Sequence, residues 1–192
     1  MCSSDLIGRH LRSSLSGFYN QMEDLIVFNN GSFTNFDAET KGMEVALQGF
    51  WTNGIRGRLS YTFQKTENHS VGWGMPDSPS HLFKFNLSAP VWRDKIFAGL
   101  EFQYTSARRS LHIDPFGMIP TIQGENAGGF GIVNFTLFSQ NLVKNLELSV
   151  SVYNLLDSSY NDPASQYPTH AHAQDTIERD GRGFRFKLTY RF

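Results

Sequence analysis

The final nine residues of the chain, 184–192, alternate between apolar and polar side chains without a break. The even positions hold Phe184, Phe186, Leu188, Tyr190 and Phe192, and the odd positions hold Arg185, Lys187, Thr189 and Arg191. Because successive side chains of a β-strand point to opposite faces, this segment predicts a strand with one aromatic, apolar face and one polar face. Such a strand is typical of a sheet that meets lipid on one side and water on the other.

The same two-residue period recurs along the rest of the chain, and no helical period competes with it. It predicts further strands at 8–21, 39–51, 55–66, 80–90, 96–108, 129–140 and 146–153. Their connections alternate in length, with short turns at 52–54, 91–95 and 141–145 and long segments at 23–38, 67–79, 109–128 and 157–182. An antiparallel meander has this alternation when its two ends face different environments.

These patterns predict an all-β fold: an antiparallel transmembrane β-barrel segment of about eight strands. Its short turns would be periplasmic and its long loops external. Trp51 and Trp92 fall at the short-turn end, where an interfacial aromatic girdle is expected. A soluble antiparallel barrel or sandwich is the alternative, but it would not need long loops at one end only.

Composition narrows the class of protein further. The 192 residues are 40% hydrophobic and 18% charged with a net charge of −1, so no basic surplus points to nucleic acid. No window approaches 18 consecutive apolar residues, which excludes a transmembrane helix. The single cysteine, Cys2, cannot form an internal disulfide and says nothing about the redox compartment.

The first residues do not have the pattern of a signal peptide, because no basic segment followed by an apolar core is present. Residues 1–6 also resemble the translation of a sequencing adaptor. We therefore expect residues 1–8 to be a non-native or unstructured leader, and residues 9–192 to form one barrel portion.

The segment Asn154–Tyr160 belongs to a set of motifs with a recognisable order. It is followed by Asp162-Pro163, by Asp180–Phe184 and by the terminal Leu188–Phe192. Together these resemble the C-terminal end of TonB-dependent outer-membrane receptors. Upstream segments that are also similar to this family's barrel are Phe18-Tyr19, Asp24-Leu25-Ile26 and Gly42-Met43-Glu44. The resemblance covers about residues 9–192.

The resemblance implies a 22-stranded barrel closed around an N-terminal plug domain, of which this chain would supply the last eight strands. The plug, absent from these residues, would contact the TonB energy-transducing complex of the inner membrane. The implied function is import of a scarce nutrient, such as a ferric siderophore, cobalamin, haem or a glycan, across the outer membrane of a Gram-negative bacterium. Other implied partners are outer-membrane lipid and the barrel-assembly machinery, which would recognise the terminal strand through Tyr190 and Phe192.

The alternative is a self-contained eight-stranded outer-membrane barrel with a structural or adhesion role. Its narrow interior would be packed with side chains. The many small residues predicted to point inward, such as Ser60, Ser88 and Ser149, fit a wide barrel better.

Two groups of residues are candidates for ligand contact. Apolar residues of the long loops could form a ligand-contacting surface, namely Trp73, Met75, Phe116 and Met118. Charged residues predicted to line the lumen are Arg56, Arg58, Lys84, Glu101, Arg185 and Lys187. Arg108-Arg109 with Lys84, Arg56 and Arg58 could attract an anionic ligand or pair with plug carboxylates, but a solvated lumen wall of mixed charge explains them better.

Catalytic and metal chemistry find little support in the sequence. His170 and His172, with Asp175 close by, have the spacing of two metal ligands on one strand face, yet they need a third ligand and supporting hydrogen-bond partners and fall in a long polar loop. No Gly-x-Ser-x-Gly nucleophile motif occurs. We expect no enzymatic activity, no cofactor and no metal site.

Overall fold

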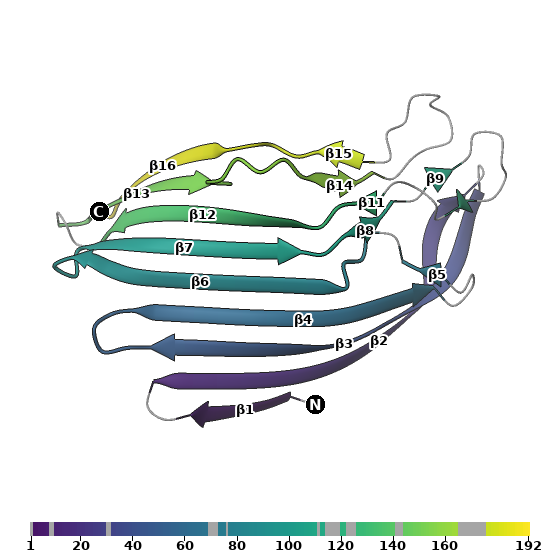
Figure 1. Cartoon of the computed structure of the whole chain (residues 1–192), viewed down its shortest axis with the longest axis horizontal. Coiled ribbons are helices and arrows are strands. Elements are labelled where there is room, and N and C mark those ends of the chain that lie inside the picture. The colour runs from purple at the N-terminus through teal and green to yellow at the C-terminus, as the bar shows by residue number, and fades with distance from the viewer. Residues whose placement is uncertain are drawn as a thin grey trace.

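The computed structural model describes residues 2–7, 10–29, 32–68, 73–75, 77–110, 112–113, 120–121, 126–140, 144–164 and 176–192. Within these ranges, no helix has the length and apolar character needed to cross a membrane. The chain forms one large antiparallel sheet in which each long strand pairs with the next along the sequence (Figure 1).

The sheet follows the order β1-β2-β3-β4-β6-β7-β12-β13-β16, with β5 added beside β4. The strands are β1 (Cys2–Ile7), β2 (Leu11–Asn29), β3 (Ser32–Phe50), β4 (Arg56–Asn68), β5 (Trp73–Gly74), β6 (His81–Trp92), β7 (Ile96–Thr105), β12 (Phe130–Ser139), β13 (Leu146–Tyr153) and β16 (Gly183–Tyr190). All eight predicted strands are therefore confirmed, and so is the meander.

Short strands lie at the end of the sheet where the long connections run, the long-loop end (Figure 1). They pair as β8 (Arg108–Arg109) with β11 (Asn126–Ala127), β9 (His112–Ile113) with β10 (Pro120–Thr121), and β14 (Asn161–Pro163) with β15 (Thr176–Glu178). The β3–β4 and β6–β7 turns and the C-terminus lie at the opposite, short-turn end. The predicted alternation of long and short connections is thus observed from β3 onward.

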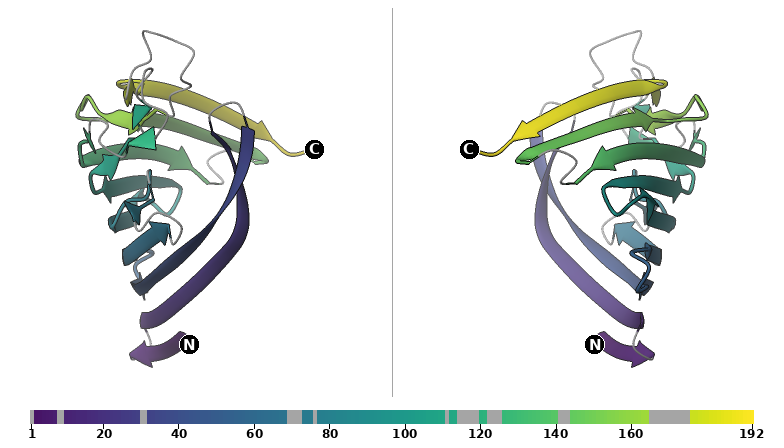
Figure 2. Two further views of the ribbon diagram at one scale, coloured as in Figure 1. Left: turned by 90° about the vertical axis from the view of Figure 1, so that its right-hand side faces the viewer. Right: turned by 90° about the vertical axis from the view of Figure 1, so that its left-hand side faces the viewer.

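The sheet curves into an open trough and does not close on itself (Figure 2). Its two end strands, β1 and β16, are not paired with each other in the described part of the chain.

The prediction of a loop at 23–38 is wrong for the residues that the structure describes. Strands β2 and β3 continue through it as a hairpin, with Leu25 opposite Phe36 and Asn29 opposite Ser32. The register shifts between Met22 and Leu25, where Asp24 has a φ of 56° and its amide donates to Asp37 Oδ1 at 3.1 Å. Asp24 therefore lies in a β-bulge, where aspartate is tolerated because it accepts a positive φ, whereas Asn29, Ser32 and Asn35, which suggested a loop, lie in the paired strands.

The expectation that residues 1–8 are unstructured also differs from the structure, because residues 2–7 form β1. Cys2 lies opposite Ser16 and Ile7 opposite Leu11 along the edge of β2. An edge strand presents a row of backbone N–H and C=O groups that an extended segment can pair with whatever its side chains are. Whether these residues are native stays a prediction.

The two faces of the sheet differ in chemistry, as the alternation predicts. Apolar side chains line up across the strands on one face, the outward face, in rows such as Leu47, Leu59, Phe85, Phe102 and Val133. This face is not covered, since Phe184 is 75% and Phe186 68% exposed. The buried apolar residues in the described ranges are only three alanines, Ala38, Ala46 and Ala127. A soluble sandwich would bury such a face in a core, so this arrangement disfavours the soluble alternative.

Trp51 closes the short-turn end of the outward face. Gly54 adopts a φ of 84° and its amide donates to Trp51 O at 3.0 Å, which confirms the tight turn predicted at 52–54. The indole folds back over Gly49, where an added Cβ would lie 2.7 Å from Cζ3 of the ring. Glycine at position 49 therefore leaves the space over the sheet that the Trp51 ring occupies.

Candidate functional site

A row of polar side chains crosses the other face of the sheet, the polar face, at a single height. Strand register places Gln48, Arg58, Asn86, Glu101 and Asn134 side by side on β3, β4, β6, β7 and β12. Because residues of one register row share a face, this row brings together groups that are far apart in sequence.

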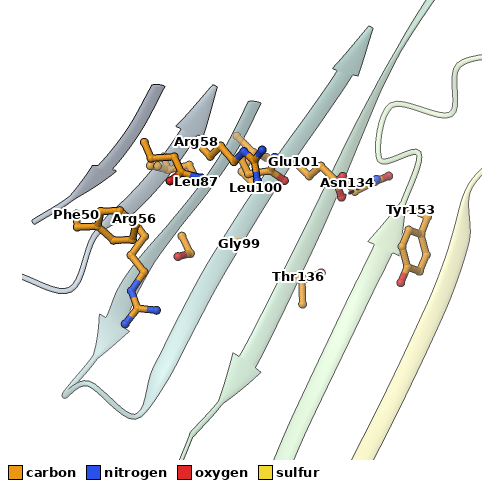
Figure 3. Close-up of a pocket in the computed structure, with 14 residues that line it drawn as sticks. Phe50, Arg56, Arg58, Leu87, Gly99, Leu100, Glu101, Asn134, Thr136 and Tyr153 are labelled. Atoms are coloured by element: carbon orange, nitrogen blue, oxygen red, sulfur yellow. Dashed lines mark hydrogen bonds between the residues drawn. The ribbon is translucent and has the colours of Figure 1, made fainter. Parts of the chain in front are cut away.

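A cavity of about 450 Å³ lies over this row (Figure 3). Its wall includes Arg56 and Arg58 of β4, Glu101 of β7 and Asn134 and Thr136 of β12, with Tyr153 at the side of β13. Charged and amide groups share the lining with the apolar groups of Phe50, Leu87, Leu100 and Tyr153, so the cavity offers both hydrogen-bonding and apolar contacts.

The charges in this cavity are only partly compensated. The Glu101 carboxylate accepts hydrogen bonds from Gln103 Nε2 and, at 3.3 Å, from Asn134 Nδ2. No ion pair within the described ranges involves Arg56 or Arg58. The two guanidinium groups therefore offer donors to something placed over the polar face.

The other residues predicted to line the lumen lie on the same face but in different rows. Lys84 is opposite Ser60 and Gln103, one row closer to the long-loop end. Arg185 is opposite Ser151 and Lys187 is opposite Ser149. The structure thus groups Arg56, Arg58 and Glu101 around one cavity and distributes the remaining three along the wall. Their role as lumen residues stays a prediction.

Sequence reasoning missed an aromatic patch on the polar face at the short-turn end. Phe97 and Phe138 are register partners whose rings stack at 5.3 Å between centroids and 14° between planes. They border a hollow of about 310 Å³ that Arg56 and Asp94 also line. The sequence contained one indication of this patch, because both phenylalanines occupy positions that the alternation of side chains assigns to the polar face.

Of the four loop residues predicted to contact a ligand, only Met75 has a described side chain, so their joint role stays a prediction. Met75 is half-buried, and its amide donates to Thr66 O at 3.0 Å, which holds it beside β4. Trp73 lies in β5 opposite Asn68, but its side chain is outside the description. Phe116 and Met118 lie outside the described residues, as do His170 and His172. Among the residues that are described, no group of three or more His, Cys, Asp or Glu could hold a metal ion.

Arg108 joins the stems of three long connections. The predicted strand 96–108 ends at Thr105, and Arg108 instead lies in β8, with a side chain only 11% exposed. Its guanidinium donates to Asp77 at 3.0 Å and to Asp162 at 2.6 Å, and it lies over the Phe130 ring. With two carboxylate partners already in place, Arg108 does not fit the suggested role of attracting an anionic ligand.

A turn at residues 154–157 ties β12, β13 and β16 together. The Asn154 side chain is buried, with 3% exposed, and its φ is 50°. Its backbone amide donates to Asn134 Oδ1 at 2.9 Å. Its side-chain Nδ2 donates to the Ser158 carbonyl, and its Oδ1 accepts from the Ser158 amide. Asp157 Oδ1 accepts from the Arg182 amide at 2.8 Å, just before β16 begins. This is the segment on which the family resemblance rests, and its structural role is to set the start of the last strand.

A sequence model of a known family matches most of the chain. The model describes the TonB dependent receptor-like β-barrel and matches residues 5–155. The chain belongs to this family. No curated protein sequence matches it.

Solved structures share the fold of this family member. The copper transporter OprC is similar with a TM-score of 0.73 and 22% identity, over 97% of this chain and 28% of OprC. The FrpB iron transporter from Neisseria meningitidis is similar with a TM-score of 0.73 and 17% identity. The match covers 98% of this chain and 30% of FrpB. The ferric-catecholate import receptor Fiu from K12 E. coli is similar with a TM-score of 0.70 and 19% identity. The match covers 97% of this chain and 26% of Fiu. The chain therefore spans between a quarter and a third of the length of these relatives.

Proposed function

We propose that this chain forms the C-terminal barrel portion of a TonB-dependent importer in the outer membrane of a Gram-negative bacterium. The single observation that carries the proposal is the family match, which covers residues 5–155. The solved relatives include proteins named as copper, iron and ferric-catecholate transporters. We propose a scarce nutrient of this kind as cargo, with ferric siderophores first and cobalamin, haem or a glycan as the other classes.

The geometry of the polar face supports this proposal. In a wide barrel the polar face borders the lumen, and the family's plug domain would fill that lumen. Arg56 and Arg58 would then meet carboxylates of the plug or of an anionic cargo across the cavity. The chain itself would act without catalysis, and coupling to TonB would run through the plug.

The open sheet gives no support to a self-contained eight-stranded barrel. Such a barrel requires its first and last strands to pair. In the described ranges β1 and β16 are the two ends of the strand order and remain unpaired with each other.

Transport by the complete receptor that carries this chain tests the proposal. It would be expressed in a Gram-negative host that lacks its own receptors, and uptake of radiolabelled catecholate and hydroxamate ferric siderophores, haem, cobalamin and copper would be measured. We expect uptake of at least one of these to rise at least ten-fold over the empty host. The rise should disappear in an otherwise identical host without TonB. Uptake that persists without TonB, or no uptake of any of the probes, contradicts the proposal.

We also propose that the end of β16 is the signal for the barrel-assembly machinery. Tyr190 and Phe192 pack edge to face with 5.1 Å between ring centroids, and Phe192 is fully exposed. Deleting Phe192 should reduce the amount of receptor in the outer membrane several-fold, because the terminal aromatic ring is removed while β16, which ends at Tyr190, stays intact. The measurement is quantitative surface labelling, with Phe192→Tyr as the aromatic control. Equal surface display of the deletion and the control would refute this role.

A further inference from the structure

Arg108 forms ion pairs with two connections that are far from it in the sequence. Asp77 belongs to the connection between β4 and β6, Arg108 to the one between β7 and β12, and Asp162 to the one between β13 and β16. Nη1 of Arg108 lies 3.0 Å from Asp77 Oδ1, and Nη2 lies 2.6 Å from Asp162 Oδ1. A single side chain therefore joins three of the long connections.

Asp162 extends these contacts to the other half of its own connection. Its Oδ2 lies 3.1 Å from Nε of Arg179, which directly follows β15. The two oxygens of one carboxylate thus contact two arginines, one from each of two connections. We call Arg108, Asp77, Asp162 and Arg179 the Arg108 junction. It contains two cations and two anions, so its charges compensate one another only when all four residues are in place.

The Arg108 junction lies on the polar face, on the long-loop side of the cavity. The Arg108 guanidinium carbon is 5.5 Å from the centre of the Phe130 ring, and the centroids of the Phe130 and Tyr160 rings are 4.3 Å apart. Phe130 is opposite Thr105 and precedes Asn134 by four residues, so it shares the face of Asn134. Four residues are about 14 Å along a strand, which places the junction beyond the cavity row at the same wall.

Burial makes the position of Arg108 depend on both of its carboxylate partners. Its side chain is only 11% exposed, and its Nε–H is buried with no hydrogen-bond partner among the described residues. A buried cation and an unpaired buried N–H both cost free energy, which nearby anions offset. Removing one partner of a buried charge leaves that charge under-compensated, so the guanidinium leaves its site more readily.

We propose that the Arg108 junction makes the described parts of these three connections one cooperative unit, which opens and closes as a whole. When Asp77 moves away, Arg108 loses compensation and releases Asp162; when Asp162 moves away, Arg108 releases Asp77 in the same manner. A contact made with any one of the three connections is thereby transmitted to the other two. Such coupling requires neither cargo nor transport.

Amide hydrogen exchange in the complete purified receptor tests the coupling, measured residue by residue by mass spectrometry with fragmentation. Two amides report on two different connections: that of Asp77 donates to Arg109 O at 2.9 Å, and that of Arg179 donates to Tyr160 O at 3.0 Å. Asp162→Asn should accelerate exchange of the Asp77 amide about ten-fold, because a hydrogen bond to a charged group is lost. Asp77→Asn should accelerate exchange of the Arg179 amide only about three-fold, because the Asp77 side chain is 64% exposed.

Two controls separate this coupling from a general loss of stability. Asp180→Asn makes the same substitution in the same connection as Asp162, at an exposed carboxylate that has no ion pair within the described ranges. It should leave exchange of the Asp77 amide unchanged. The Gly54 amide donates to Trp51 O at the short-turn end, and its exchange should be the same in every variant.

A receptor with Arg108→Gln shows whether the coupling runs through Arg108. This substitution should accelerate exchange of both reporter amides, and adding Asp162→Asn to it should have no further effect on the Asp77 amide. Acceleration confined to the connection that carries the substitution overturns the inference, and so does an undiminished effect of Asp162→Asn when Arg108 is replaced. Nutrient uptake is measured separately, and its absence contradicts the proposed function without changing the exchange expected here.

Discussion

Replacing Asn154 with alanine should lower the free energy of unfolding of the complete receptor by about 2–5 kcal/mol. Two effects add. The substitution removes both side-chain hydrogen bonds to Ser158 from a residue that is 3% exposed, and unpaired buried polar groups cost about 1–3 kcal/mol. It also places alanine at a φ of 50°, in the left-handed region, which costs about 1–2 kcal/mol. The measurement is equilibrium unfolding in urea of the receptor folded in lipid vesicles.

Asn145 provides a matched control for the backbone term. It lies in the β12–β13 turn with a φ of 62° and is exposed, and its carbonyl accepts from the Arg191 amide at 3.0 Å. Asn145→Ala keeps that backbone bond and changes only the left-handed residue, so it should cost about 1–2 kcal/mol. If the two variants lose the same stability, the side-chain bonds of Asn154 do not contribute and this account of the turn is wrong.

The neighbouring Asp157 explains why this turn matters for the last strand. Its carboxylate accepts from the Arg182 amide, and an added Cβ on Gly181 would lie 2.9 Å from the same Oδ1. The chain returning from the last long connection therefore has to bring Gly181-Arg182 against Asp157 before β16 can pair with β13. The motif that carried the family resemblance fixes the register of β16, which alternation alone leaves free by steps of two residues.

The alternation of side chains was sufficient to predict the eight strands β2, β3, β4, β6, β7, β12, β13 and β16, their order and their two faces, but not β1. A strand with one apolar and one polar side has a period of two, and few other structures have it, so the segments at 55–66 and 146–153 were located to within about two residues. The points at which the strands end were harder to predict from the sequence. The polar run at 23–38 favoured a loop, because polar residues such as Asn29, Ser32 and Asn35 do not show how far the two strands of a hairpin extend.

The candidate site could be predicted only where it follows from strand parity. Arg56, Arg58 and Glu101 share a face because each occupies a polar-face position. Which of them lie side by side depends on the register between β4, β6 and β7, which the sequence does not give. Phe97 and Phe138 were missed because their contact depends on the register between β7 and β12, which strand parity does not give. The ion pairs of Arg108 with Asp77 and Asp162 also could not be predicted, because contacts between loops have no periodic signal in the sequence.

Placing arginine at Val150 should destabilise the membrane-embedded receptor by about 2–4 kcal/mol, the cost of a cation on the lipid face near the middle of the bilayer. Val150 lies on the outward face in the middle of β13, opposite Leu137 of β12 and Phe186 of β16, and is 48% exposed. The matched control is its neighbour Ser149, which points to the polar face beside Lys187 and Glu147. Because the polar face meets water or polar groups, Ser149→Arg should change stability by less than about 1 kcal/mol. Equilibrium unfolding in lipid vesicles measures both, and equal losses at the two adjacent positions would contradict the assignment of the outward face to lipid.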